Sequence, residues 1–269
     1  DRLRPRTLSI VSTGTSLGVA AAGITAFGAG LTGLSWRAGW AIFTAAAVFA
    51  LLVNWRALRP VAGSPGPPSH HPWAARAAGA ARPLYAVAFS FGVTTAIYIS
   101  FAADRVEQAG GLPGLPAGLS APVLFTAFGL LGLVGLATGR MKAATGLVTL
   151  LRLLLAAAAL SHLLIAAAPA SWPGVVLSAG LQGAYVMISS AVFAFWSDRL
   201  FPALPSLSFT AALLAVAAGS VLGPVVAGAL AGPFGDAAMF LFGAGISVTT
   251  IAILGKHHVR ERPARDLAA

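Results

Sequence analysis

The 269-residue chain contains no cysteine and very little charge. Without cysteine, neither a disulfide framework nor thiolate coordination of a metal is possible. Charged residues make up 9% of the chain, whereas a typical soluble domain has about 25%. Lysine is nearly absent, with Lys142 and Lys256 as the only two, so almost all basic residues are arginine. This excess of arginine over lysine is typical of a GC-rich bacterial gene. With 58% hydrophobic residues, the chain is predicted to be an integral membrane protein.

Acidic residues are also scarce, and all seven lie at the ends of the long apolar stretches or between them: Asp1, Asp104, Glu107, Asp198, Asp236, Glu261 and Asp266. Catalytic sites and proton-coupled carriers usually need a protonatable group at depth. The sequence therefore contains no candidate catalytic constellation. It predicts a protein that is not an enzyme and has no cofactor and no metal site.

Eight apolar stretches are close to the roughly 20 residues needed to cross the hydrocarbon core of a bilayer. They are Thr7–Gly33, Ala38–Trp55, Pro83–Ala103, Ala121–Thr138, Ala143–Ala168, Gly174–Ser197, Leu207–Ala231 and Asp236–Gly255. Backbone groups in lipid must be paired within the segment, so these spans must be helices. The sequence predicts an all-α, polytopic transmembrane helix bundle of about eight spans.

Basic residues are distributed unequally between the two ends of these spans. Fourteen fall on the side of the N-terminus: Arg2, Arg4, Arg6, Arg56, Arg59, Arg76, Arg82, Arg140, Lys142, Arg199, Lys256, Arg260, Arg262 and Arg265. Only Arg37 and Arg105 fall on the opposite side, and Arg152 lies inside a span. Because cytoplasmic loops are enriched in Lys and Arg, both termini are predicted to be cytoplasmic.

The stretch between the second and third spans, Arg56–Arg82, contains many proline, glycine and serine residues and no long apolar run. Such a composition predicts a solvated linker. His70 and His71 are adjacent there, but without further ligands they do not define a metal site.

A glycine pattern occurs twice, with glycines at i, i+4 and i+9. The two copies are related by a shift of 205 residues and consist of Gly14, Gly18 and Gly23, and of Gly219, Gly223 and Gly228. Glycine lets membrane helices approach closely, and two copies favour a transporter built from two related halves. The alternative is that Ala/Gly-rich helices produce this spacing by chance.

Polar side chains inside the spans are the candidate substrate-binding residues. Ser178, Gln182, Tyr185 and Ser189 follow the i, i+4, i+7, i+11 pattern of one helix face. Thr94 and Tyr98 share a face of the third span. These residues could line a transport path, or they could make hydrogen bonds between helices.

Arg152 and His162 lie within the fifth span. Arg152 could bind an anionic substrate, or its side chain could extend to the membrane surface or pair with a neighbouring helix. His162 could titrate during transport, or it could make a packing hydrogen bond.

The layout resembles the major facilitator superfamily of transporters. Thr7–Gly33 is similar to family helix five, Trp36-Arg37 to the pair that often follows it, and Arg56–Arg82 to the central cytoplasmic loop. Residues 83–255 would be the complete C-terminal half. The resemblance implies a partial fold divided into 1–57 (last two helices of the N-terminal half), 58–82 (central loop), 83–256 (six-helix half) and 257–269 (cytoplasmic tail). Four further helices are expected to precede it.

Two motifs carry this resemblance in detail. Gly135-Leu-Ala-Thr-Gly139-Arg140-Met-Lys142 resembles the Gly-x-x-x-Asp-Arg cytoplasmic loop motif, with Gly139 in place of the aspartate. Gly14-x-x-x-Gly18 resembles the glycine motif of antiporters, although Val19 replaces its proline, which Gly223-Pro224 retains in the other half.

The family implies a secondary transporter of the inner (plasma) membrane that moves a small organic solute by alternating access, with efflux as one direction. Its partners would be the solute, the lipid bilayer and a proton or other coupling ion, and no nucleic acid. The alternative is a non-transporting scaffold, a signalling protein or an inactive fragment with a degenerate transporter fold. The substituted loop motif and the lack of buried carboxylates favour that alternative.

Overall fold

The computed structural model describes the backbone of residues 3–59, 74–201, 205–255 and 259, and side chains from residue 14 onward except at 74–80 and 205. All regular structure in these ranges is helical, which confirms the all-α prediction. The elements are α1 (Leu3–Leu31), α2 (Trp36–Leu58), α3 (Ala74–Gln108), α4 (Ser120–Gly132), η1 (Leu133–Ala137), α5 (Thr138–Thr145), α6 (Leu147–Ala167), α7 (Trp172–Leu200), α8 (Pro205–Phe234) and α9 (Ala237–Ile253).

Each of the eight predicted spans corresponds to a helical segment. Seven segments in the described part of the chain are long and apolar enough to cross a membrane, and α4, η1 and α5 together form one of them, Ser120–Thr145. The eighth, α9, is apolar but has only 17 residues, or about 25 Å of helix. The chain is thus a multi-pass helical membrane protein.

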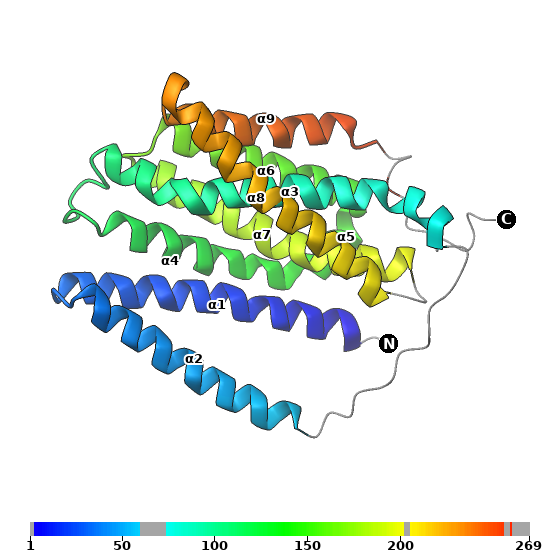
Figure 1. Cartoon of the computed structure of the whole chain (residues 1–269), viewed down its shortest axis with the longest axis horizontal. Coiled ribbons are helices and arrows are strands. Elements are labelled where there is room, and N and C mark those ends of the chain that lie inside the picture. Colours follow the sequence, from blue (N-terminus) through cyan, green and yellow to red (C-terminus); the bar gives the residue numbers. More distant parts are fainter. Residues whose placement is uncertain (1–2, 60–73, 202–204, 256–258, 260–269) are drawn as a thin grey trace.

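The helices lie side by side in a bundle, with α9 at one edge and α2 at the other (Figure 1). The closest pairs are α3 with α8, α1 with α4, α4 with α7, and α6 with both α7 and α9. The α7 helix contributes most to the interior, including the fully buried side chains of Tyr185, Phe193 and Trp196. By contrast, no residue of α2 is buried, and this helix diverges from α1 along its length.

The predicted linker Arg56–Arg82 is too long at both ends. The α2 helix continues to Leu58, and α3 begins at Ala74, nine residues before the predicted start at Pro83. Alanine-rich sequence has a high helix propensity, and Pro83 is accommodated within the helix, as membrane helices allow. Residues 60–73, with His70 and His71, lie outside the described residues, as does nearly all of the predicted tail 257–269.

The Gly135–Lys142 motif is helical throughout, although the predicted span ends at Thr138 and the family resemblance implies a cytoplasmic loop after it. The backbone changes from α4 to the 3-10 turn η1 and then to α5. The Thr138 hydroxyl donates to the Gly135 carbonyl at 2.5 Å and supports this change of helical geometry. The chain leaves the helix only at Gly146, whose φ of 77° is accessible to glycine without strain.

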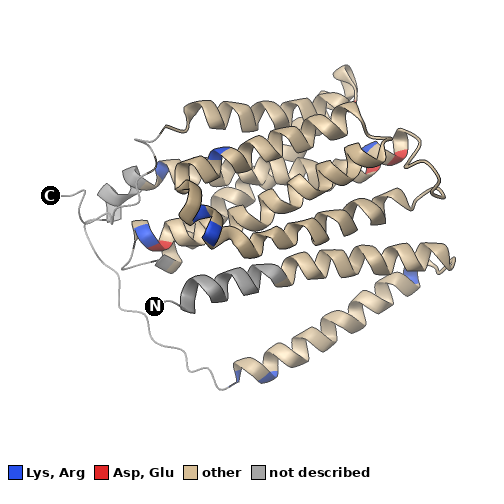
Figure 2. Ribbon diagram, turned by 180° about the vertical axis from the view of Figure 1, so that it is seen from behind, with Lys and Arg blue, Asp and Glu red and all other residues tan. Residues whose placement is uncertain are grey.

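Most of the described Lys and Arg positions lie toward one end of the bundle, as the blue segments of the ribbon in Figure 2 show from the reverse side. Arg56 and Arg59 lie at the end of α2, Arg140 and Lys142 in α5, and Arg199 in the last turn of α7. The opposite end holds Arg37 at the start of α2 and Arg105 in the last turn of α3. The helix directions therefore produce the unequal charge distribution that the span assignment predicts.

Candidate functional site

The predicted substrate-binding residues of α3 and α7 are buried inside the bundle. Thr94, Tyr98 and Gln182 have no exposed surface, and Tyr185 and Ser189 are at most 2% exposed. The i, i+4, i+7, i+11 stripe of α7 therefore faces protein along its whole length. We call Thr94, Tyr98, Ser161, His162, Ser178, Gln182 and Tyr185 the polar seam, because they lie on the facing sides of α3, α6 and α7.

Three hydroxyl groups join α3, α6 and α7 at one level of this seam. The Ser178 hydroxyl donates to the Ser161 carbonyl at 2.8 Å, and the Ser161 hydroxyl donates to the Ser178 carbonyl at 2.9 Å. The Tyr98 hydroxyl lies 3.0 Å from the Ser178 hydroxyl and brings in α3. This reciprocal arrangement satisfies buried polar groups without any charge.

Thr94 and Tyr185 form a second bridge between α3 and α7. The Thr94 hydroxyl donates to the Ser90 carbonyl of its own helix at 2.9 Å, so its oxygen is free to accept from the Tyr185 hydroxyl at 3.3 Å. The Tyr185 ring packs against Phe91, with ring centroids 5.2 Å apart. These contacts fix the tyrosine hydroxyl at the α3–α7 boundary.

Gln182 is the exception in the seam. Its side chain is fully buried, yet neither the amide nitrogen nor the amide oxygen has a hydrogen-bond partner among the described residues. The buried hydroxyl of Thr95 on α3 also lacks one there. An unsatisfied buried polar group costs about 1–3 kcal/mol. Gln182 therefore presents a donor and an acceptor that a water molecule or a bound solute could satisfy.

His162 belongs to the seam and is fully buried. Its Nδ1 lies 2.8 Å from the Ala158 carbonyl and its Nε2 lies 3.1 Å from the Thr94 carbonyl on α3. Sequence reasoning identified His162 but not its neighbour Ser161. The only signal for Ser161 is that the two form a polar pair in an otherwise apolar helix segment.

Arg152 does not join the other candidate residues. Its side chain is exposed, and its Nε and Nη2 donate to the Leu254 carbonyl at 3.1 and 2.6 Å. Leu254 caps the C-terminal end of α9, where a positive charge is favourable. Arg152 therefore links α6 to the end of α9. This agrees with the alternative that Arg152 pairs with a neighbouring helix.

The two glycine patterns pack in different ways. A Cβ atom at Gly219 or Gly223 would lie closer than 3.0 Å to the backbone of Phe89 or Val93 on α3, and one at Gly23 would meet Pro122 and Thr126 on α4. At Gly14, Gly18 and Gly228, no described atom lies within 4 Å of that position. Pro224 lies inside α8, which continues to Phe234.

In the Gly135–Lys142 motif, Gly135 packs against Met187 of α7. A Cβ at Gly139 would meet no described atom within 4 Å, and the side chain of Arg140 is exposed. Gly139, which stands where the related motif has an aspartate, therefore lies at the surface of the basic end.

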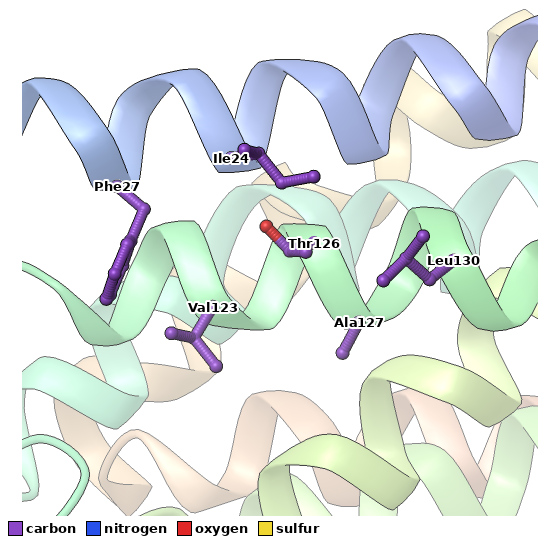
Figure 3. Close-up of a pocket in the computed structure, with 6 residues that line it drawn as sticks. All are labelled: Ile24, Phe27, Val123, Thr126, Ala127 and Leu130. Atoms are coloured by element: carbon purple, nitrogen blue, oxygen red, sulfur yellow. The ribbon is translucent and has the colours of Figure 1, made fainter.

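A separate apolar groove of about 280 Å³ lies between α1 and α4 (Figure 3). Its lining residues are Ile24, Phe27, Val123, Thr126, Ala127 and Leu130. The only side-chain hydroxyl among them, on Thr126, donates to the Pro122 carbonyl of its own helix. The groove therefore offers apolar contact, whereas the hydrogen-bonding groups lie in the polar seam.

Comparison with protein-family models, with curated proteins and with solved structures finds no match to this chain. The class that the fold and the site define is a multi-pass helical membrane protein whose interior contains a polar seam without Asp, Glu, Lys or Arg.

Proposed function

We propose that the protein is a secondary transporter of the major facilitator type that moves a small, uncharged organic solute by alternating access. The observation that carries this proposal is Gln182 of the polar seam, whose two buried amide atoms have no hydrogen-bond partner among the described residues. Membrane proteins place polar groups at depth where they face a partner or a pathway. Since the seam contains no Asp, Glu, Lys or Arg, its ligand would carry hydroxyl or amide groups.

The hydrogen bonds of the seam suggest how a solute would be admitted. The Thr94–Tyr185 and Tyr98–Ser178 pairs join α3 to α7. A solute that entered between these helices would exchange those bonds for its own and would also pair with Gln182. Glycine contacts between α3 and α8 would let the helices shift against each other, because at Gly219 and Gly223 the two backbones meet without an intervening side chain.

The same proposal includes orientation and domain organisation. The basic end of the bundle would face the cytoplasm at the inner (plasma) membrane, because positive residues favour that side. Residues 1–57 and 83–256 would belong to the two halves of the transporter, joined by 58–82. The coupling ion would be a proton or another small cation.

A flux assay in liposomes tests the transport function. A panel of uncharged solutes with hydroxyl or amide groups is loaded, and release is measured with the purified protein. We expect Gln182→Ala and Tyr185→Ala to lower the flux of a transported solute about tenfold, because about 1.4 kcal/mol of hydrogen bonding is lost. Gln108→Ala is the matched control, since this glutamine pairs with Asp104 at the exposed end of α3.

Single-cysteine labelling tests the orientation, and the natural absence of cysteine makes the background clean. Thr145→Cys lies at the basic end and Ser35→Cys in the connection between α1 and α2 at the other end. We expect a membrane-impermeant thiol reagent added to intact cells to label position 35 and not position 145. The reverse result would overturn the orientation.

The second candidate function is a non-transporting membrane scaffold or signalling protein. The polar seam favours this function, because the predicted binding residues of α3 and α7 are almost completely buried. The replacement of the motif aspartate by Gly139 in Gly135–Lys142 also favours it. A folded protein that moves no member of the solute panel, and whose Gln182→Ala variant gains stability, would fit this function instead.

A further inference from the structure

His162 is the one titratable side chain of the polar seam other than its two tyrosines, and both of its ring nitrogens face backbone carbonyls. Nδ1 lies 2.8 Å from the Ala158 oxygen in α6, and Nε2 lies 3.1 Å from the Thr94 oxygen in α3. One contact is within a helix and the other joins two helices. The ring is fully buried, so neither nitrogen is exposed at the surface of the bundle.

Carbonyl oxygens only accept hydrogen bonds. A neutral imidazole has one N–H and one nitrogen lone pair, whereas the protonated ring has two N–H groups. The neutral ring can therefore satisfy one of the two carbonyls, and it turns a lone pair toward the other. Only the protonated ring can donate to both carbonyls.

Among the described residues, no Asp or Glu makes a hydrogen bond or ion pair with the ring. The Tyr98 ring centroid is 5.8 Å away and that of Phe240 is 6.2 Å away. On α9, a Cβ at Gly243 would lie 2.5 Å from Cδ2 and 2.7 Å from Nε2, so a glycine is required for the ring to fit. The cradle is thus formed by α3, α6 and α9.

Charged and titratable groups approach this cradle from few directions. Tyr98 contacts the ring from α3, and Tyr185 of α7 lies beside Thr94. Arg105 of α3 donates to the Ala166 carbonyl, one turn beyond His162, and Asp236 precedes the first turn of α9. Arg152, on α6 itself, is engaged by Leu254. Between Trp172 and Ser197, α7 contains no charged residue.

We propose that His162 is a proton-binding site that fastens α3 to α6 when it is charged. A proton from water adds to the ring nitrogen that carries the lone pair, and Nε2–H then donates to the Thr94 carbonyl. When the proton leaves, Nδ1–H keeps the shorter bond to Ala158 and the link between the two helices is lost. This inference does not depend on transport, because it concerns the ring and two helices rather than a solute.

Nitrogen-15 NMR of a single-histidine protein tests the proton site. His70, His71, His257 and His258 are replaced by asparagine, and the chain is labelled with ¹⁵N-histidine in lipid nanodiscs. We expect both ring nitrogens to give N–H signals at the acidic end of a series from about pH 4 to about pH 8, and only one nitrogen to do so at the alkaline end. Signals of one neutral tautomer throughout that range would overturn the proposal.

Distances between spin labels test the link between the helices. Ile99→Cys on α3 and Leu163→Cys on α6 carry the labels, because both side chains are substantially exposed and the chain has no other cysteine. We expect the distance distribution to become broader and longer as the pH rises. In a His162→Gln background it should not respond to pH.

A labelled pair on α1 and α4, Leu17→Cys with Leu131→Cys, is the control and should not respond to pH in either background. A shift of the α3–α6 distance that persists in His162→Gln, or no shift in the chain with His162, would contradict the proposed link. If His162→Gln does not fold, the NMR and distance series on the protein that retains His162 still decide the question.

Discussion

Helices α1 and α8 contain the same glycine spacing and use opposite faces of it. In α8 the first two glycines, Gly219 and Gly223, contact α3, and Gly228 has no described neighbour. In α1 the first two, Gly14 and Gly18, have no described neighbour, and Gly23 contacts α4. The repeat in the sequence is therefore not a repeat in packing.

Helix geometry explains the difference. A separation of four residues is about 1.1 turns, so the first two glycines share a face, whereas nine residues make about two and a half turns and place the third on the opposite face. Each helix has one face toward the bundle and can use only one set. On α1 that face holds Ser16, Ala20 and Gly23, and Gly129 of α4 packs against the first two.

The largest expected effect separates the two faces of α8. Gly219→Leu should lower the free energy of unfolding by about 3 kcal/mol, since the new side chain meets the α3 backbone and cannot be accommodated without displacement. Gly228→Leu should instead stabilise by up to about 1 kcal/mol, because leucine has a higher helix propensity and no described atom obstructs it. Unfolding in mixed detergent micelles measures both. Equal losses would contradict the assignment of faces.

A smaller effect is expected in α1, where the third glycine of the pattern, and not the first two, is in contact with a neighbouring helix. Gly23→Ala should cost about 1 kcal/mol, because the added methyl meets Pro122 and Thr126, although the Thr126 hydroxyl can partly move away. Gly18→Ala should instead stabilise by up to about 1 kcal/mol through helix propensity. The same unfolding assay applies. A gain in stability at both positions would mean that α1 does not approach α4 closely through Gly23.

The smallest expected change in stability concerns a hydrogen bond between helices rather than a close contact at a glycine. Tyr98→Phe removes the hydrogen bond to Ser178, which keeps its bonds to Ser161. We expect a loss of about 0.6 kcal/mol, the average for hydrogen bonds between membrane helices. Tyr85→Phe, at a half-buried position of the same helix, is the control. A loss larger than that of Gly23→Ala would show that the seam contributes more than close backbone packing.

The burial of the candidate site was predictable to a useful degree. A stripe at i, i+4, i+7 and i+11 in an apolar helix must face protein or water, because an amide in lipid loses its hydrogen bonds. Gln182 and Tyr185 follow that rule. The partners were not predictable, because Thr94 lies 91 residues from Tyr185 and Ser161 lies 17 residues from Ser178.

The sequence alone determined the helices, their approximate ends and the segregation of basic residues, because hydropathy and backbone hydrogen bonding are local properties. Only the tertiary structure decided which glycines touch a neighbour, that Arg152 binds the end of α9, and that α2 lies apart from the core. Those features depend on how one helix is rotated against another. That rotation is set by side chains distant in the chain, and no single helix encodes it.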